Sequence, residues 1–285
     1  MNELELKNLS EKIRLYSQKF VIPFYLKNES DNMVFSATLT LVEYKTRFFG
    51  LTAAHAIPKN YDLNKGIYII GLNGEVDISS LTLVHRFDDV DLIILDFHAK
   101  HFSEDRYYFN LDIGYPKKSF REDMFIWSGF PAKKTKDIGK ENPKTLASQG
   151  INGNLMTFAK SLLARIPFKE NYTFNSMDEY FYGYSDLKNA SYAKEGIKSK
   201  GYSYRGMSGG AFCLLNIKCP YLVSKDNSCL IGNKLFYFIG IGIEHKKDNT
   251  VVGVGRKIIL EKLEEIIKNP VEFSFILTKD SISIE

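Results

Sequence analysis

A glycine-rich run in the last third of the chain places a serine where it could act as a nucleophile. The run is RGMSGGAF, residues 205–212, in which Ser208 lies between Gly206 and Gly209. A serine hydroxyl attacks a carbonyl efficiently only when an imidazole removes its proton, and a carboxylate must fix the tautomer of that imidazole. The sequence must therefore also supply a histidine and an acid that can reach Ser208.

One candidate pair follows the serine, in the order acid and then histidine. Asp226 and His245 fit that order, and the G-x-S-x-G spacing around Ser208 matches the nucleophile elbow of the α/β-hydrolases, which would make the protein an esterase. Such an elbow needs a buried strand before the serine and a helix after it. Residues 195–205 (EGIKSKGYSYR) are too polar for that strand, and residues 210–216 (GAFCLLN) have the pattern of a strand. The surroundings therefore argue against this alternative.

The other candidate pair precedes the serine. His55 ends the short run TAAH (52–55), which follows a strand-like segment, and Asp91 begins the apolar run DLIIL (91–95). An acid at the first position of an apolar strand can be held at the end of that strand while the strand itself is buried. Three nearby acids are weaker candidates, because two lie in a polar turn and one lies at the far end of the strand: Asp88, Asp89 and Asp96.

The elements that position these residues are expected to be β-strands. Short apolar or alternating runs, separated by turn residues, predict strands at 20–27, 34–43, 47–57, 66–72, 82–87, 92–97, 123–130, 154–166, 210–216, 235–244 and 249–255. Apolar residues at helical spacing predict two helices, 2–18 and 256–268. The tyrosine-rich segment 168–205 is expected to be irregular. Many short strands with frequent turns favour barrels or sandwiches over a parallel α/β sheet.

Three of these motifs, taken in order, resemble the catalytic blocks of one enzyme family. TAAH at 52–55, DLIIL at 91–95 and GMSGGAF at 206–212 resemble the blocks of the trypsin-like (chymotrypsin-fold) serine peptidases, and the lack of paired cysteines resembles their intracellular bacterial type. The resemblance covers roughly residues 20 to 260.

The fold implied by this resemblance is mainly β, with two six-stranded antiparallel barrels and a helix at each end of the chain. The expected divisions are an N-terminal helix (1–18), a first barrel (19–118), a second barrel (119–255) and a C-terminal helix and tail (256–285). The first barrel would carry the histidine and the aspartate, and the second would carry the serine.

The resemblance also implies a role for each site residue. Ser208 would attack the scissile carbonyl, His55 would act as general base and then general acid, and Asp91 would orient His55. The backbone N–H groups of Gly206 and Ser208 would form the oxyanion hole. The protein would then be a serine endopeptidase that works through an acyl-enzyme. A catalytically silent or partner-gated binding module on the same fold is the alternative.

The substrate pocket is expected around five further residues. By resemblance, Tyr202 would form the base of the pocket, and its walls would be Ile241, Gly242, Ile243 and Gly253. No acid lies at the expected base, so a strong preference for lysine or arginine is not expected, and an apolar or small side chain is the expected occupant. Glu244 would add to a preference for a basic side chain if it points inward. Secreted digestive members carry an acid directly before the serine, whereas this chain has Met207, so activation by N-terminal cleavage is not expected.

The composition argues against several other classes of function. The formal net charge is +4, too small to predict a nucleic-acid-binding surface. No run approaches the roughly 18 to 20 apolar residues of a membrane-spanning helix, and the N-terminus lacks a secretory signal. The three cysteines are an odd number, which favours free thiols and a cytoplasmic location.

Neither a metal nor a cofactor is expected. The sequence has no C-x-x-C pair and no H-E-x-x-H motif, and His98 and His101 lie in a polar stretch typical of a surface. The expected partners are a protein or peptide substrate, with a regulatory protein as an open option, and neither nucleic acid nor membrane.

Overall fold

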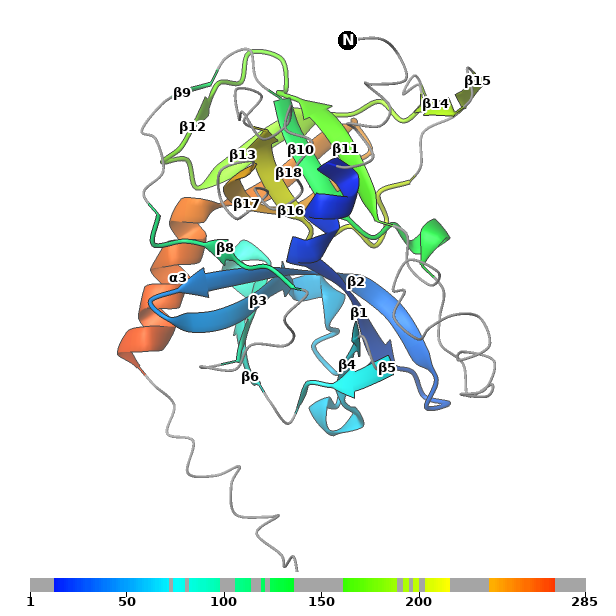
Figure 1. The fold of residues 1–285 in the computed structure, drawn as a ribbon, viewed down its shortest axis with the longest axis vertical. Helices are drawn as coiled ribbons and strands as arrows, with labels where there is room; N and C mark the ends of the chain where they lie inside the picture. Colours follow the sequence, from blue (N-terminus) through cyan, green and yellow to red (C-terminus); the bar gives the residue numbers. More distant parts are fainter. Residues whose placement is uncertain are drawn as a thin grey trace, which may run out of the picture.

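The computed structural model describes most of the chain as two β-sheets packed together (Figure 1). The described residues are 13–71, 74–79, 82–97, 106–113, 119–120, 124–135, 161–188, 192–194, 197–199, 203–215 and 236–269. The expected mainly β fold is confirmed. Helix α3 (Arg256–Lys268) has the predicted bounds. Of the predicted helix 2–18, residues 13–17 are helical and lead into the 3-10 turn η1 (Gln18–Phe20), whereas residues 2–12 lie outside the described residues.

The first sheet has eight strands: β1 (Val21–Lys27), β2 (Met33–Tyr44), β3 (Arg47–Ala53), β4 (Ile67–Gly71), β5 (Gly74–Asp77), β6 (Leu83–Phe87), β7 (Leu92–Asp96) and β8 (Phe109–Asn110). Their order is β5-β4-β1-β2-β3-β7-β6, all antiparallel, with β8 added parallel to β2. The resemblance implied six strands here.

The second sheet has the six antiparallel strands that the resemblance implies, in the order β11-β10-β16-β17-β18-β13. They are β10 (Met124–Gly129), β11 (Leu162–Pro167), β13 (Tyr180–Tyr184), β16 (Ala211–Leu215), β17 (Phe236–His245) and β18 (Thr250–Gly255). Two small antiparallel pairs accompany them: β9 (Ser119–Phe120) with β12 (Phe174–Asn175), and β14 (Tyr192–Lys194) with β15 (Ile197–Ser199).

The side chains on one face of each sheet form a core inside that barrel, and those on the other face form a third core between the two sheets. Along β7, Ile93 and Leu95 point into the first barrel, while Leu92 and Ile94 join the cluster between the two sheets. The strand is buried on both faces, which explains why its sequence is a continuous apolar run. Each such aliphatic side chain contributes about 1.5–3 kcal/mol by leaving water.

Helix α3 packs its apolar stripe onto the cluster between the sheets. Ile258, Ile259, Leu263 and Ile266 recur at helical spacing, and all four are buried. The helix begins directly after Gly255, the last residue of β18, so the second sheet and α3 are one continuous segment (Figure 1).

The predicted strands agree with the structure to within a few residues, except in two places. Within the expected strand 154–166, the structure describes only 161–166, of which 162–166 belong to β11. The segment 168–205 was expected to be irregular, yet it contains β13, an edge strand whose buried Phe181 and Gly183 alternate with exposed Tyr182 and Tyr184. The dense tyrosines concealed that alternation, because tyrosine is apolar on one part of its surface and polar at its tip.

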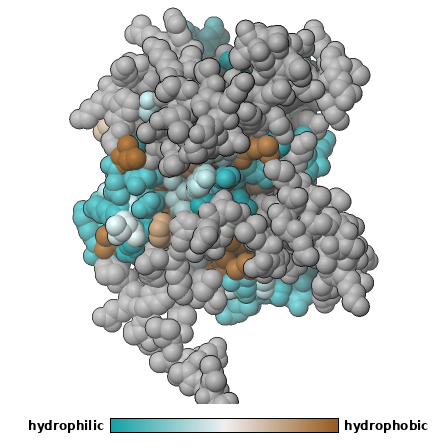
Figure 2. Space-filling view, viewed as in Figure 1, coloured by the Kyte–Doolittle hydropathy of each residue, from teal (hydrophilic) through white to brown (hydrophobic). Residues whose placement is uncertain are grey.

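The visible surface of the described residues is mostly hydrophilic, with hydrophobic residues in small separate groups (Figure 2). Among the residues that the structure describes, five large hydrophobic side chains are exposed: Leu63, Ile113, Met177, Tyr182 and Tyr184. Scattered exposure of this kind is ordinary in folded proteins. In the part of the chain that the structure describes, no helix has the length and apolar content to cross a membrane.

Candidate active site

His55 lies on the 3-10 turn η2 (Ala54–Ala56), directly after β3. Its neighbours Ala53, Ala54 and Ala56 are buried, whereas the His55 side chain is 53% exposed. Small side chains let the turn pack tightly against the sheet while the imidazole stays outside. The position of His55 at the end of β3 agrees with the strand that its sequence context predicts.

Asp91 reaches His55 because of the register between β3 and β7. Ala53 pairs with Leu92, so the residues just beyond these paired positions, His55 and Asp91, lie at the same end of the sheet. The 3-10 turn η5 (Asp88–Val90) precedes Asp91, whose backbone adopts the left-handed conformation with φ 52° and ψ 46°. Its carbonyl accepts a hydrogen bond from the N–H of Ala54 at 3.0 Å, which ties the two turns together.

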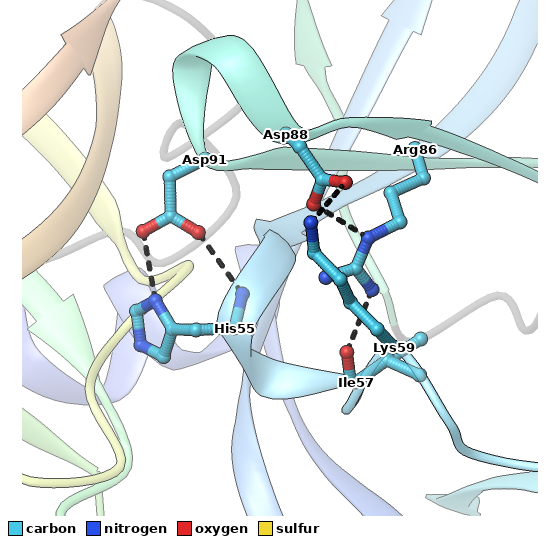
Figure 3. A network of polar contacts seen from close by, with 6 residues as sticks. All are labelled: His55, Ile57, Lys59, Arg86, Asp88 and Asp91. Atoms are coloured by element: carbon cyan, nitrogen blue, oxygen red, sulfur yellow. Dashed lines mark hydrogen bonds and ion pairs between the residues drawn. The ribbon is translucent and has the colours of Figure 1, made fainter.

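One carboxylate binds both the backbone and the ring of His55 (Figure 3). The His55 N–H donates to Oδ1 of Asp91 at 2.9 Å, and Nδ1 of the ring lies 2.8 Å from Oδ2. Because a carboxylate only accepts, Nδ1 carries the proton and Nε2 is the basic nitrogen of the neutral ring. The hydrogen bond to Asp91 raises the pKa of His55, burial opposes the rise, and the charges of Asp91 and Glu244 add to it.

Two of the competing acids have other partners. Asp88 forms ion pairs with Lys59 at 2.9 Å and Arg86 at 2.7 Å, as Figure 3 shows. Asp96 is fully buried at the far end of β7 and forms an ion pair with Arg47. The acid that bonds to His55 is Asp91.

The Ser208 loop consists of two successive β-turns. The N–H of Met207 donates to the carbonyl of Tyr204 at 2.9 Å, and the N–H of Gly210 donates to that of Met207 at 2.8 Å. The third residue of each turn is a glycine with positive φ, Gly206 at 90° and Gly209 at 82°. Positive φ at this position is the mark of a type II turn and strongly favours glycine. The glycines of the motif are therefore required by the backbone.

Threonines of the first barrel hold this loop. The N–H of Thr38 donates to the carbonyl of Ser208 and its Oγ1 donates to that of Gly206, both at 3.0 Å. Oγ1 of Thr40 donates to the carbonyl of Gly209 at 2.6 Å. A methyl group added to Gly209 would lie 2.2 Å from the carbonyl oxygen of Thr38 and 2.7 Å from Cα of Thr52. These threonines were not among the sequence candidates, although polar residues inside apolar strands were a visible signal.

The structure thus brings the three predicted catalytic residues to one region, with one contact missing. Ser208, which is half-buried, precedes Gly209, and Gly209 packs against Thr52, three residues before His55. Within the described residues no hydrogen bond joins Ser208 Oγ to His55. The backbone N–H groups of Gly206 and Ser208 also have no hydrogen-bond acceptor among the described residues.

The predicted pocket residues lie along β17 and β18, except Tyr202, which is outside the described residues. Gly242 exchanges hydrogen bonds with the serine loop, accepting from Gly209 N–H at 2.7 Å and donating to the Gly210 carbonyl at 2.8 Å. Ile241 and Ile243 belong to the hydrophobic cluster between the sheets. Gly253 pairs with Gly242 and faces the ring of Phe181.

Met207 is completely buried in the core of the second barrel, next to Gly129. Its side chain fills apolar space, where an ionised group would be costly without a partner. The position before the serine therefore serves packing in this chain.

The α/β-hydrolase alternative is wrong. Ser208 leads into the antiparallel strand β16, whereas an elbow requires a helix at that point. The ring of His245 contacts the ring of Tyr204, and its Nε2 bonds the carbonyl of Ser185 at 2.9 Å. Asp226 lies outside the described residues, as do His98 and His101. Among the residues that the structure places, no three His, Cys, Asp or Glu side chains are grouped to hold a metal ion.

The two curled antiparallel sheets, with His55 and Asp91 on the first and Ser208 on the second, define a chymotrypsin-like double β-barrel. No protein-family model matches the chain, and no curated protein matches it significantly. Solved structures with similar folds include an inactive serine-to-alanine mutant of Rv3671c from M. tuberculosis H37Rv, with 13% identity, coverage of 93% of this chain and 94% of that one, and a TM-score of 0.45. Another is a double mutant of human heparin binding protein (CAP37), with 9% identity, coverage of 90% and 94%, and a TM-score of 0.48. Likenesses this distant do not assign an activity, and the class of fold rests on the sheet topology.

Proposed function

We propose that this protein is a serine endopeptidase of the trypsin-like family. Nε2 of His55 accepts the proton of Ser208 Oγ as the oxygen attacks the peptide carbonyl, and the resulting imidazolium gives that proton to the leaving amine. Water then adds to the acyl-enzyme and loses a proton to His55, and the imidazolium returns that proton to Ser208 Oγ as the bond to the acyl group breaks and the acid leaves. Asp91 stabilises the charged ring throughout.

The hydrogen-bonded pair of Asp91 and His55 is the observation that carries this proposal. Asp91 uses both of its carboxylate oxygens on this histidine, one on its backbone N–H and one on its ring. The pair leaves Nε2 as the free basic nitrogen of a largely exposed imidazole. That arrangement is what a general base requires.

The turns around Ser208 support the same mechanism. The N–H groups of Gly206 and Ser208, which donate to no described acceptor, are available to bind the oxyanion of a tetrahedral intermediate. We assign the substrate pocket to Tyr202, Ile241, Gly242, Ile243 and Gly253 by resemblance, as part of the same proposal.

A catalytically silent or partner-gated module is the second candidate. It is favoured by one observation, namely that no hydrogen bond joins Ser208 Oγ to His55 within the described residues. Such bonds are often long in peptidases without substrate, so the geometry is compatible with both candidates.

A fluorophosphonate probe, which labels activated serines, separates the two candidates. For the peptidase we expect labelling of the wild type and its loss in Ser208→Ala and His55→Ala. His245→Ala is the matched control, because its ring is engaged with Ser185 and labelling should persist. Absence of labelling in the wild type would support the silent module. Cleavage of a peptide library, compared with Ser208→Ala as the blank, then tests the endopeptidase activity directly.

A further inference from the structure

Arg86 links the two backbone segments that carry His55 and Asp91. Its Nη1 donates to the carbonyl of Ile57 at 2.7 Å, and Ile57 directly follows the turn η2. Its Nε donates to Oδ1 of Asp88 at 2.7 Å, and Asp88 begins the turn η5. In Figure 3 the guanidinium lies between these two partners, beside the bonded pair of Asp91 and His55. One side chain therefore ties the histidine segment to the aspartate segment.

The loop that carries Asp91 is held from outside its own hairpin. The turn η5 and Asp91 connect β6 to β7, which pair from Phe87 and Leu92 outward. Asp91 has φ 52°, a left-handed conformation that costs free energy for residues other than glycine and persists only where neighbouring structure holds it. Packing holds the inner side of the loop, because Phe87 and Val90 lie against the cluster between the sheets. The hydrogen bonds of Arg86 hold its outer side.

Arg86 is better suited to this role than Lys59, which also contacts the carboxylate of Asp88. The ammonium of Lys59 lies 2.9 Å from Asp88, but the lysine side chain is 74% exposed. Exposed ion pairs of flexible lysines contribute little, because solvent screens the charge and the side chain loses entropy. The side chain of Arg86 is only 26% exposed, and its planar guanidinium donates in two fixed directions at once, to a carbonyl and to a carboxylate. A lysine ammonium lacks that fixed geometry.

We propose that Arg86 is a positioning residue of the proposed active site, and that it acts by fixing the place of the His55 turn relative to the Asp91 loop. This inference rests on the proposed peptidase function and adds a residue to that site. The hydrogen bond between Nδ1 of His55 and Asp91 sets the tautomer of the ring, and a displacement of either segment lengthens it. A misplacement of about 1 Å in a catalytic site can cost about 100-fold in rate.

The pKa of His55 distinguishes this positioning role from a direct effect of charge. The hydrogen bond to Asp91 contributes most to the raised pKa of His55, and the charges of Asp91 and Glu244 add to it. Removing the positive charge of Arg86 would by itself raise that pKa further, because the imidazolium would be repelled less. Loosening the hydrogen bond to Asp91 would lower the pKa. The two effects of replacing Arg86 therefore have opposite signs.

Steady-state kinetics of Arg86→Met, Arg86→Lys and Lys59→Met test the proposal. Lys59→Met is the matched control, because it removes a positive charge from the same carboxylate and leaves both hydrogen bonds of Arg86 in place. We expect Arg86→Met to lower kcat by about 10-fold to 100-fold with little change in KM. Arg86→Lys should recover part of this loss, and Lys59→Met should stay within about twofold of the wild type. Each rate is measured well below the thermal unfolding temperature of its variant, so that kcat reports on folded protein.

NMR of histidine-labelled protein gives a readout that does not depend on activity. In Arg86→Met the Nδ1 proton of His55 should exchange faster with water and the pKa of the ring should fall, because the bond to Asp91 is loosened. In Lys59→Met the proton should stay as protected as in the wild type, and the pKa should not fall. If Arg86→Met does not fold, Arg86→Lys carries the same test, since it keeps the charge and loses the two-directional contact.

Three results would overturn this inference and leave the peptidase standing. They are a kcat of Arg86→Met within about twofold of the wild type, equal losses of kcat in Arg86→Met and Lys59→Met, and an unchanged or raised pKa of His55 in Arg86→Met. Absence of both fluorophosphonate labelling and cleavage in the wild type would instead overturn the peptidase proposal. The NMR measurement would then still show whether Arg86 positions the pair.

Discussion

Asp91 and His55 are joined by two hydrogen bonds from a single carboxylate, at 2.9 Å to the backbone N–H and 2.8 Å to Nδ1 of the ring. The two residues are 36 positions apart in the chain, and the β3–β7 register brings them together. The carboxylate therefore fixes both the place of the histidine and the orientation of its ring.

Asp91→Asn should lower kcat by about 1,000-fold to 10,000-fold while the fold is kept. The amide oxygen can still accept the backbone N–H of His55, but the amide nitrogen donates to Nδ1 and selects the wrong tautomer. Steady-state kinetics and thermal unfolding measure the two effects separately. Asp96→Asn is the contrasting variant, since it removes the charge that pairs with Arg47 in the core. It should cost about 3 kcal/mol or more of stability. Equal effects of the two variants on kcat would contradict the assignment of Asp91.

The activity should rise with pH as His55 loses its proton. Because the hydrogen bond to Asp91 raises the pKa of His55, the midpoint of kcat/KM should lie above the usual histidine value of 6.5. Asp91→Asn should move the midpoint down. Because the pKa of His55 is raised in the folded state, protonation of His55 also stabilises the folded protein. This contribution to the unfolding free energy is complete below about pH 6.5 and is lost as the pH rises through the pKa of His55 in the folded protein. A midpoint below 6.5 in the wild type would count against the pair.

Gly209→Ala should abolish fluorophosphonate labelling and destabilise the protein by about 2–4 kcal/mol. The added methyl would meet the backbone of Thr38 and Thr52, which cannot move aside without shifting the loop. Gly66→Ala is the matched control, since Gly66 also has positive φ (87°) but its methyl would meet the side chain of Tyr68. It should cost about 1–2 kcal/mol and keep the labelling. Labelling of Gly209→Ala at the wild-type rate would show that the loop does not need this contact.

Thr38→Val should reduce kcat and cost about 1–3 kcal/mol of unfolding free energy. The valine has nearly the same shape, but Oγ1 is lost, which leaves the Gly206 carbonyl and the Phe130 N–H without that partner. Thr82→Val is a matched control, because Thr82 is also buried and its Oγ1 also donates to a carbonyl, that of Ile78. It should cost similar stability without lowering kcat. A loss of kcat in both variants would mean that the lower kcat results from general destabilisation and not from the lost contact with the serine loop.

The sequence by itself determined the strands and the candidate residues. Alternating apolar residues specify a two-faced strand, and the Leu92–Leu95 run specifies one that is buried on both faces, because only local chemistry is needed to read these patterns. The order of His55, Asp91 and Ser208 also favoured one class of serine enzyme over the α/β-hydrolases. Strand β13 was missed where tyrosines obscured the period.

Only the tertiary structure decided how these parts meet. The β3–β7 register selected Asp91 from among its neighbours, and the threonines of β2 proved to hold the serine loop. Each of these relationships depends on a register or on a contact between distant strands. Such pairings are set by the packing of the whole chain, and no local pattern of residues records them.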